Sequence, residues 1–145
     1  FQEGHAMLET GTPRIAEAIG WGAAVEWLDG HDMKEIHSHI NRIASWTAEQ
    51  ISEIDGMTVY GDPTRGDSSG AVSFLHESIQ SQDLALLLDE GGFAVRTGHH
   101  CAQPLMDALG VPSTNRASFW LYNTMDEAEA FVEHLRYVVD RFSDK

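Results

Sequence analysis

Residues 116–142 read RASFWLYNTMDEAEAFVEHLRYVVDRF, and this stretch predicts a strand followed directly by a long helix. The segment from Arg116 to Tyr122 is rich in aromatic residues, which favour strands. The segment from Asp126 to Phe142 carries apolar residues every three or four positions, which is the spacing of one helical face. This apolar stripe consists of Ala128, Phe131, Val132, Leu135, Val138, Val139 and Phe142. A short strand beside an amphipathic helix favours an α+β fold.

The chain before this stretch predicts further helices and short strands. Thr12 is expected to cap the first helix, with Pro13 in its first position, and Ser81 is expected to cap the third. Glycines at 30, 56 and 91–92 mark helix ends. In chain order, the helices and strands are expected at residues 12–28, 32–54, 58–60, 71–75, 81–90, 93–96 and 104–109. We therefore predict a small mixed or antiparallel sheet covered by helices.

Composition restricts the classes of partner. The net charge is −14 and only nine residues are Lys or Arg, which argues against binding to nucleic acid. No apolar run approaches the roughly 20 residues of a membrane span. A single cysteine excludes an internal disulfide and favours a reducing, cytoplasmic compartment. Residues 1–7 resemble a protease-site and cloning remnant, with a natural terminus as the alternative, and we leave them out of the fold.

The segment 96–102, RTGHHCA, contains the chain's only cysteine, Cys101. Gly98 suits a loop that presents a thiol, and the flanking histidines and Arg96 are suited to favouring the thiolate, the reactive form. The alternative is that Cys101 is a small buried apolar residue. A metal site is disfavoured, because adjacent residues rarely bind one ion and no Cys-x-x-Cys pair supplies further ligands.

Two other positions have a functional and an ordinary interpretation. Arg116 can bind a carboxylate through two of its guanidinium nitrogens, or form an ordinary surface ion pair in so acidic a chain. Gly11 and Thr12 precede the first helix, where they can bind a phosphate or simply cap the helix.

Three stretches together resemble the cysteine desulfurases of the pyridoxal-phosphate-dependent class V aminotransferase family. Residues 9–13, ETGTP, with the helical residues that follow them, resemble the start of a helix in that family. Residues 96–106, RTGHHCAQPLM, resemble the cysteine loop of the SufS and CsdA branch, and residues 116–124, RASFWLYNT, resemble the strand that carries the substrate-binding arginine. The fold implied is the C-terminal small domain of aspartate-aminotransferase-like enzymes.

The resemblance implies a role for each matching residue. Cys101 takes the sulfur of L-cysteine as a persulfide, releasing alanine, for sulfur transfer and iron–sulfur cluster assembly. Arg116 binds the substrate carboxylate and Arg96 supports the same site. Thr12, with Gly11 beside it, binds the phosphate of pyridoxal 5'-phosphate across a homodimer interface. A sulfur-acceptor protein is the further partner implied.

The family's Schiff-base lysine lies in an upstream His-His-Lys stretch, whereas this chain has only Lys34 and Lys145. We therefore expect the C-terminal part of a desulfurase: residues 8–30 from the end of the large domain and residues 31–145 from the small domain. By itself such a chain is expected to be inactive. The alternatives are a selenocysteine lyase and a non-catalytic, stand-alone sulfur-carrier or binding module.

Overall fold

The computed structural model describes residues 4–8, 11–62 and 69–143. The sequence interpretations of residues 1–3, 9–10 and 145 therefore lie outside the described residues. The chain divides into two compact units, Phe1–Glu35 and Ile36–Lys145.

The first unit contains a short 3-10 helix, Gly4–Leu8, and the helix α1, Ile15–Asp29. The prediction that Thr12 caps this helix is wrong, because the residue at the N-cap position is Arg14 and no side chain bonds there. The Ile15 N–H donates to the Pro13 carbonyl oxygen at 2.9 Å, so a tight turn separates Thr12 from the first helical residue. The predicted end at Gly30 is confirmed.

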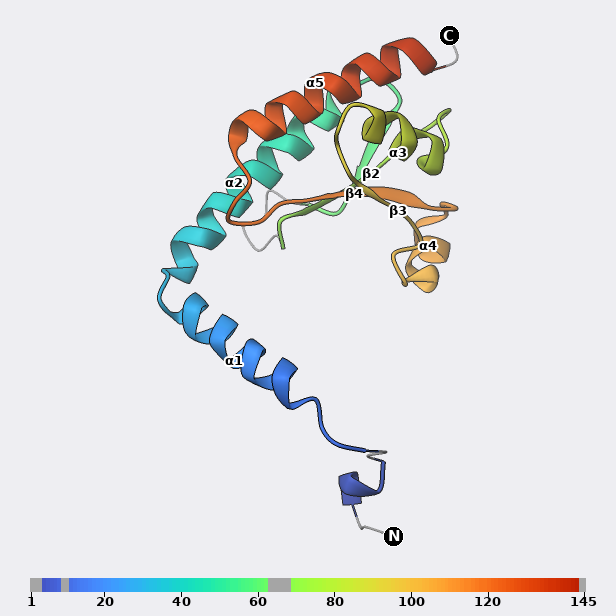
Figure 1. Ribbon diagram of the computed structural model, residues 1–145. Coiled ribbons are helices and arrows are strands. Elements are labelled where there is room, and N and C mark those ends of the chain that lie inside the picture. Colours follow the sequence, from blue (N-terminus) through green and yellow to red (C-terminus); the bar gives the residue numbers. More distant parts are fainter. Residues whose placement is uncertain (1–3, 9–10, 63–68, 144–145) are drawn as a thin grey trace. The chain divides into compact units, whose positions relative to one another are not determined.

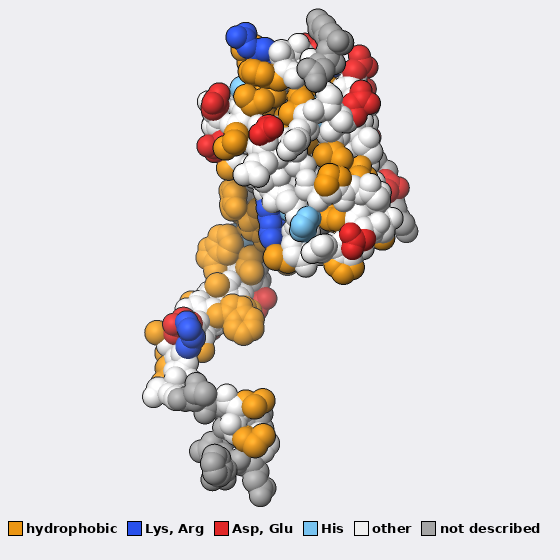
Figure 2. All heavy atoms as spheres, turned by 90° about the vertical axis from the view of Figure 1, so that its right-hand side faces the viewer, with side chains coloured by type: hydrophobic (Ala, Val, Ile, Leu, Met, Phe, Trp, Pro, Cys, Tyr) orange, Lys and Arg blue, Asp and Glu red, His pale blue; other side chains and the backbone are white. Residues whose placement is uncertain are grey.

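No residue of α1 is buried, although most of its residues are apolar and they are not confined to one face. Its large exposed apolar residues are Ile15, Ile19, Trp21, Val25 and Trp27. Figure 2 shows apolar side chains along this helix. A helix of this composition is normally buried against another surface.

The second unit is built on a four-stranded antiparallel sheet (Figure 1). Its strands are β1 (Met57–Tyr60), β2 (Ala71–His76), β3 (Arg96–Gly98) and β4 (Thr114–Ser118), in the spatial order β1-β2-β4-β3. Each neighbouring pair is antiparallel, with Phe74 opposite both Val59 and Asn115. The predicted small sheet is confirmed, in its antiparallel form.

Three helices cover one face of the sheet: α2 (Met33–Ser52), α3 (Ser81–Glu90) and α5 (Met125–Phe142). Their apolar faces meet inward-facing sheet residues in one core, which includes Ile51, Phe74, Leu84, Ala117 and Leu135. The predicted stripe of α5 is buried except at its last residue, Phe142. The short α4 (Gln103–Leu109) lies toward the other face (Figure 1). No described helix is both long and apolar enough to cross a membrane.

Two strands were predicted at the wrong residues. The strand expected at 93–96 is found at Arg96–Gly98, because the Phe93 N–H still bonds to the Leu88 carbonyl and so belongs to the end of α3. The strand expected at 116–122 is found at Thr114–Ser118. It ends there because the Asn123 side chain accepts the Trp120 N–H at 2.8 Å and turns the chain toward α5.

One smaller feature concerns the start of α3. Ser81 is the first residue of α3 rather than its cap, and its hydroxyl contacts the Ser113 hydroxyl at 2.8 Å.

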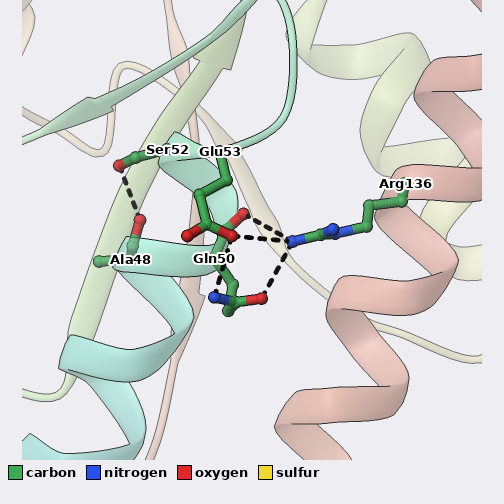
Figure 3. Close-up of polar contacts among 5 residues, drawn as sticks. All are labelled: Ala48, Gln50, Ser52, Glu53 and Arg136. Carbon is green, nitrogen blue, oxygen red and sulfur yellow. Dashed lines mark hydrogen bonds and ion pairs between the residues drawn. The ribbon is translucent and has the colours of Figure 1, made fainter.

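Arg136 of α5 donates to the Gln50 side-chain oxygen at 3.0 Å and lies 3.5 Å from a Glu53 oxygen of the chain segment just after α2 (Figure 3). These contacts join the exposed edges of α2 and α5 above the core.

Candidate active site

Cys101 lies in the loop between β3 and α4, whose backbone takes the left-handed conformation at three positions. Gly98, His100 and Cys101 have φ values of 112°, 55° and 62°. Glycine adopts such values freely, whereas a left-handed residue with a Cβ costs about 1–2 kcal/mol. A bond from the Ala102 N–H to the His99 carbonyl, 2.9 Å long, closes the turn before α4. The strained pair His100–Cys101 must therefore be held by other contacts.

The Cys101 thiol is free and exposed, so it is not a buried apolar residue of the core. The Arg96 guanidinium donates from Nη2 to Sγ at 3.3 Å. A permanently charged donor of this kind is a suitable partner for a thiolate or for the persulfide that would replace it. The positive charge in contact with the thiol thus comes from the strand before the loop.

The two loop histidines differ in their surroundings. His100 is half-buried, and its Nε2 lies 3.0 Å from the carbonyl oxygen and 2.9 Å from the hydroxyl of Thr114. Burial lowers the pKa of His100, and the charges of Arg116, Arg96 and His99 lower it further, against the opposite effect of the Thr114 backbone bond. His100 is therefore neutral at neutral pH, and His99 is exposed.

A cavity of about 510 Å³ adjoins the loop, and the sheet residues that line it include Arg116. The residues around it are Tyr60, Gly61, Ser73, His100, Ala102, Leu105, Met106, Leu109, Thr114 and Arg116. Its α4 wall is apolar, and Arg116 supplies the charge. The Arg116 Nε is buried and has no hydrogen-bond partner among the described residues. Arg116 is the arginine among the residues that line the cavity, and a guanidinium is a group that can pair with a carboxylate.

Arg116 and Arg96 are directly opposite each other on β4 and β3. Like charges at such positions are unfavourable without a nearby anion. Among the predicted site residues, the structure thus brings Arg96, Cys101 and Arg116 to one place. Gly11 and Thr12 are exposed residues of the first unit, which is described by itself.

Sequence reasoning did not identify Thr114, Tyr60 and Ser73 as neighbours of the site. Thr114 lies two residues before Arg116 on β4, and residues two apart in a strand share a face. That signal needs the true start of β4, which was predicted two residues too late. Ser73 pairs with Arg116 across β2 and β4, a register that only the sheet reveals.

Comparison with known proteins shows the family of the chain. The family model for aminotransferase class V matches residues 1–131. A probable cysteine desulfurase of Halalkalibacterium halodurans is 46% identical over 134 residues, which make up 92% of this chain and 32% of the relative. A cysteine desulfurase of Haloferax volcanii is 41% identical over 125 residues, covering 86% of this chain and 29% of the relative.

Solved structures give the same result. The crystal structure of the cysteine desulfurase CsdA from Escherichia coli matches with a TM-score of 0.86 and 33% identity, over 97% of this chain and 34% of that chain. A cysteine desulfurase from Thermococcus onnurineus matches with a TM-score of 0.87 and 33% identity, over 97% of this chain and 35% of that chain. The chain spans about a third of the length of the curated relatives it matches. The chain belongs to the aminotransferase class V family.

Proposed function

We propose that this chain is the part of a cysteine desulfurase that carries the sulfur-accepting cysteine, Cys101. The overall reaction transfers the sulfur atom of L-cysteine to the Cys101 thiol, which becomes a persulfide, and releases L-alanine. Atoms balance without a further oxidant or reductant, because the sulfur moves from the substrate carbon to the enzyme thiol. The whole enzyme would also contain a counterpart of the remaining two-thirds of its relatives, which this chain does not match.

The observation that carries the proposal is the contact between Arg96 and an exposed Cys101 beside a cavity that contains Arg116. Cys101 would act as the nucleophile, since it is the chain's only thiol and lies at the surface. Arg116 would bind the substrate carboxylate, because it supplies the positive charge of the cavity lining. Arg96 would stabilise negative charge on the accepting sulfur.

The family depends on pyridoxal phosphate, and this chain fits that cofactor only in part. Its lysines are Lys34 and Lys145, and Lys34 is exposed at the start of α2, outside the unit that holds Cys101. We therefore assign the covalent attachment to no residue of this chain. Gly11 and Thr12 suit the phosphate, because they precede the N-terminus of α1 and no side chain caps that helix.

The remaining partners follow from the same proposal. The complete enzyme would be a homodimer in which Thr12 serves the cofactor of the other subunit, and a sulfur-acceptor protein would take the persulfide sulfur from Cys101. An exposed Cys101 supports such a transfer. A cytoplasmic location suits a lone thiol that must stay reduced.

A second candidate function is a stand-alone sulfur carrier. The observation that favours it is that Cys101 and its arginine partner belong to the same unit of this chain. A carrier needs only a thiol that accepts and releases sulfur, and it would not form alanine.

A chimeric enzyme distinguishes the two proposed functions. The 134 matching residues of the Halalkalibacterium relative would be replaced by this chain, and L-alanine formation from L-cysteine would be measured. This protein, called the graft below, should form alanine, and its Cys101→Ser variant should not. Cofactor absorbance in both proteins checks that they fold alike. A Cys101→Ser graft as active as the parent graft would contradict the desulfurase proposal, and an inactive graft with bound cofactor would favour the carrier.

A further inference from the structure

The His100 ring connects the cysteine loop to the neighbouring strand. Its Nε2 contacts both oxygens of Thr114, the first residue of β4, which is almost fully buried. Thr114 is also the register partner of Gly98, the last residue of β3. The ring therefore reaches back across the turn and holds the loop against the strand from which the loop has just separated.

The hydrogen-bond pattern defines the ring's tautomer. A backbone carbonyl can only accept, so His100 Nε2 carries the hydrogen that Thr114 receives. In the neutral ring, Nδ1 then has a lone pair, and this atom is buried without a partner among the described residues. Protonation of Nδ1 would place a charge in a dry position, so the ring serves as a fixed neutral donor.

The backbone explains why such an anchor is needed. His100 and Cys101 are the only described residues other than glycine with positive φ, and they are adjacent. The strain of two such residues would be released if the loop relaxed. Relaxation would move Sγ, because its position depends on the direction of the Cα–Cβ bond of Cys101. The 3.3 Å contact between Sγ and Arg96 would then change.

We propose that His100 is a positioning residue for the cysteine: its ring, bound to Thr114, holds Cys101 so that Sγ stays in contact with the Arg96 guanidinium. This inference rests on the proposed role of Cys101 as the sulfur acceptor and assigns no chemical step to His100. The charged and titratable groups that act on the ring are Arg116 on β4, Arg96 on β3 and His99 in the loop, and Tyr60 at the end of β1 lines the same cavity as His100. Arg96 is the one that contacts the thiol.

The test compares two alkylating reagents on the isolated chain. Iodoacetate is an anion and iodoacetamide is neutral, and both react with the thiolate of Cys101. The ratio of their rate constants therefore cancels the thiolate fraction and reports the positive charge beside Sγ. His100→Asn is the informative variant, because asparagine tolerates positive φ better than most residues but lacks the ring.

We expect His100→Asn and Arg96→Gln each to lower the iodoacetate-to-iodoacetamide ratio by about fivefold, the factor for one unit charge about 4 Å away in water. The double variant should lower it no further than either single variant, because both remove the same contact. Thr114→Val keeps the carbonyl and loses the hydroxyl, so its ratio should fall by less. His99→Asn, the matched change at the neighbouring exposed histidine, should leave the ratio near its original value.

The proposal is overturned if folded His100→Asn keeps the original ratio, or if His99→Asn lowers the ratio equally. Circular dichroism establishes folding, and if His100→Asn does not fold, an unchanged ratio in Thr114→Val overturns the proposal instead. The alkylation ratio needs no substrate or cofactor. An inactive graft together with the expected ratios would therefore contradict the proposed function alone.

Discussion

Asn115, in the middle of β4, is fully buried and opposite Phe74 of the core. Neither its amide oxygen nor its amide nitrogen has a hydrogen-bond partner among the described residues. A buried polar group left unsatisfied costs about 1–3 kcal/mol. Asn115 therefore lowers the stability of the core, and it precedes Arg116, the residue proposed to bind the substrate, in the sequence.

Replacing Asn115 with valine should raise the free energy of unfolding by about 1 kcal/mol, because the change removes the unpaired amide and suits a strand. Urea unfolding followed by circular dichroism measures the effect. The control is Asn123→Ala, which removes an amide that accepts the Trp120 N–H and should destabilise by about 1 kcal/mol. A clear loss of stability in Asn115→Val would show that the amide is satisfied in solution.

At the same scale, residue type alone made Cys101, Arg96 and Arg116 candidates with ordinary alternatives, and only the resemblance to cysteine desulfurases gave each of them a role. The sequence could not identify the His100–Thr114 contact, which depends on the positive φ of His100 and Cys101. Most residues avoid that conformation, so no propensity predicts it. The roles of these residues in catalysis remain proposals.

Among the helices, α5 has the best-defined start. The Thr124 hydroxyl accepts the Glu127 N–H at 3.2 Å, and the Glu127 carboxylate accepts the Thr124 N–H at 2.9 Å, which forms a capping box. The contact of Arg136 with Gln50 and Glu53 is, by contrast, exposed (Figure 3). The cap satisfies backbone groups that otherwise lack partners, whereas the ion pair is screened by water.

We therefore expect Thr124→Ala to lower the free energy of unfolding by about 1 kcal/mol. Arg136→Ala should cost at most about 0.5 kcal/mol, and the difference from the parent chain should shrink further in high salt. Both values come from urea unfolding at low and high ionic strength. A greater loss in Arg136→Ala than in Thr124→Ala would mean that α2 and α5 are held together mainly at their exposed edges.

Helices were predicted better than strands because their apolar stripes extend over many turns. α2 and α5 have their predicted positions to within two residues at each end. β3 has only three residues, and its limits depend on pairing with β4 rather than on its own side chains. The aromatic residues after Ser118 favour a strand locally, but the turn closed by Asn123 prevents it.

At the scale of the whole molecule, α1 is rich in apolar residues and has no buried residue. Its exposed apolar residues, Ile19 and Trp21 among them, predict that the isolated chain associates with itself through this helix. Sedimentation equilibrium should show a mass above that of the monomer. Ile19→Glu combined with Trp21→Glu should restore the monomer, whereas Leu86→Glu, at an exposed apolar residue of α3, should not. A parent chain that is monomeric at all concentrations would contradict this prediction.

In the complete enzyme that we propose, sulfur from L-cysteine arrives on Cys101. The direct measurement is mass spectrometry of peptides from the graft, blocked with an alkylating reagent after a single turnover with L-cysteine. We predict one additional sulfur atom on the peptide that contains Cys101, in an amount that matches the alanine formed. Alanine formed without any persulfide on Cys101 would contradict the proposal that Cys101 accepts the sulfur.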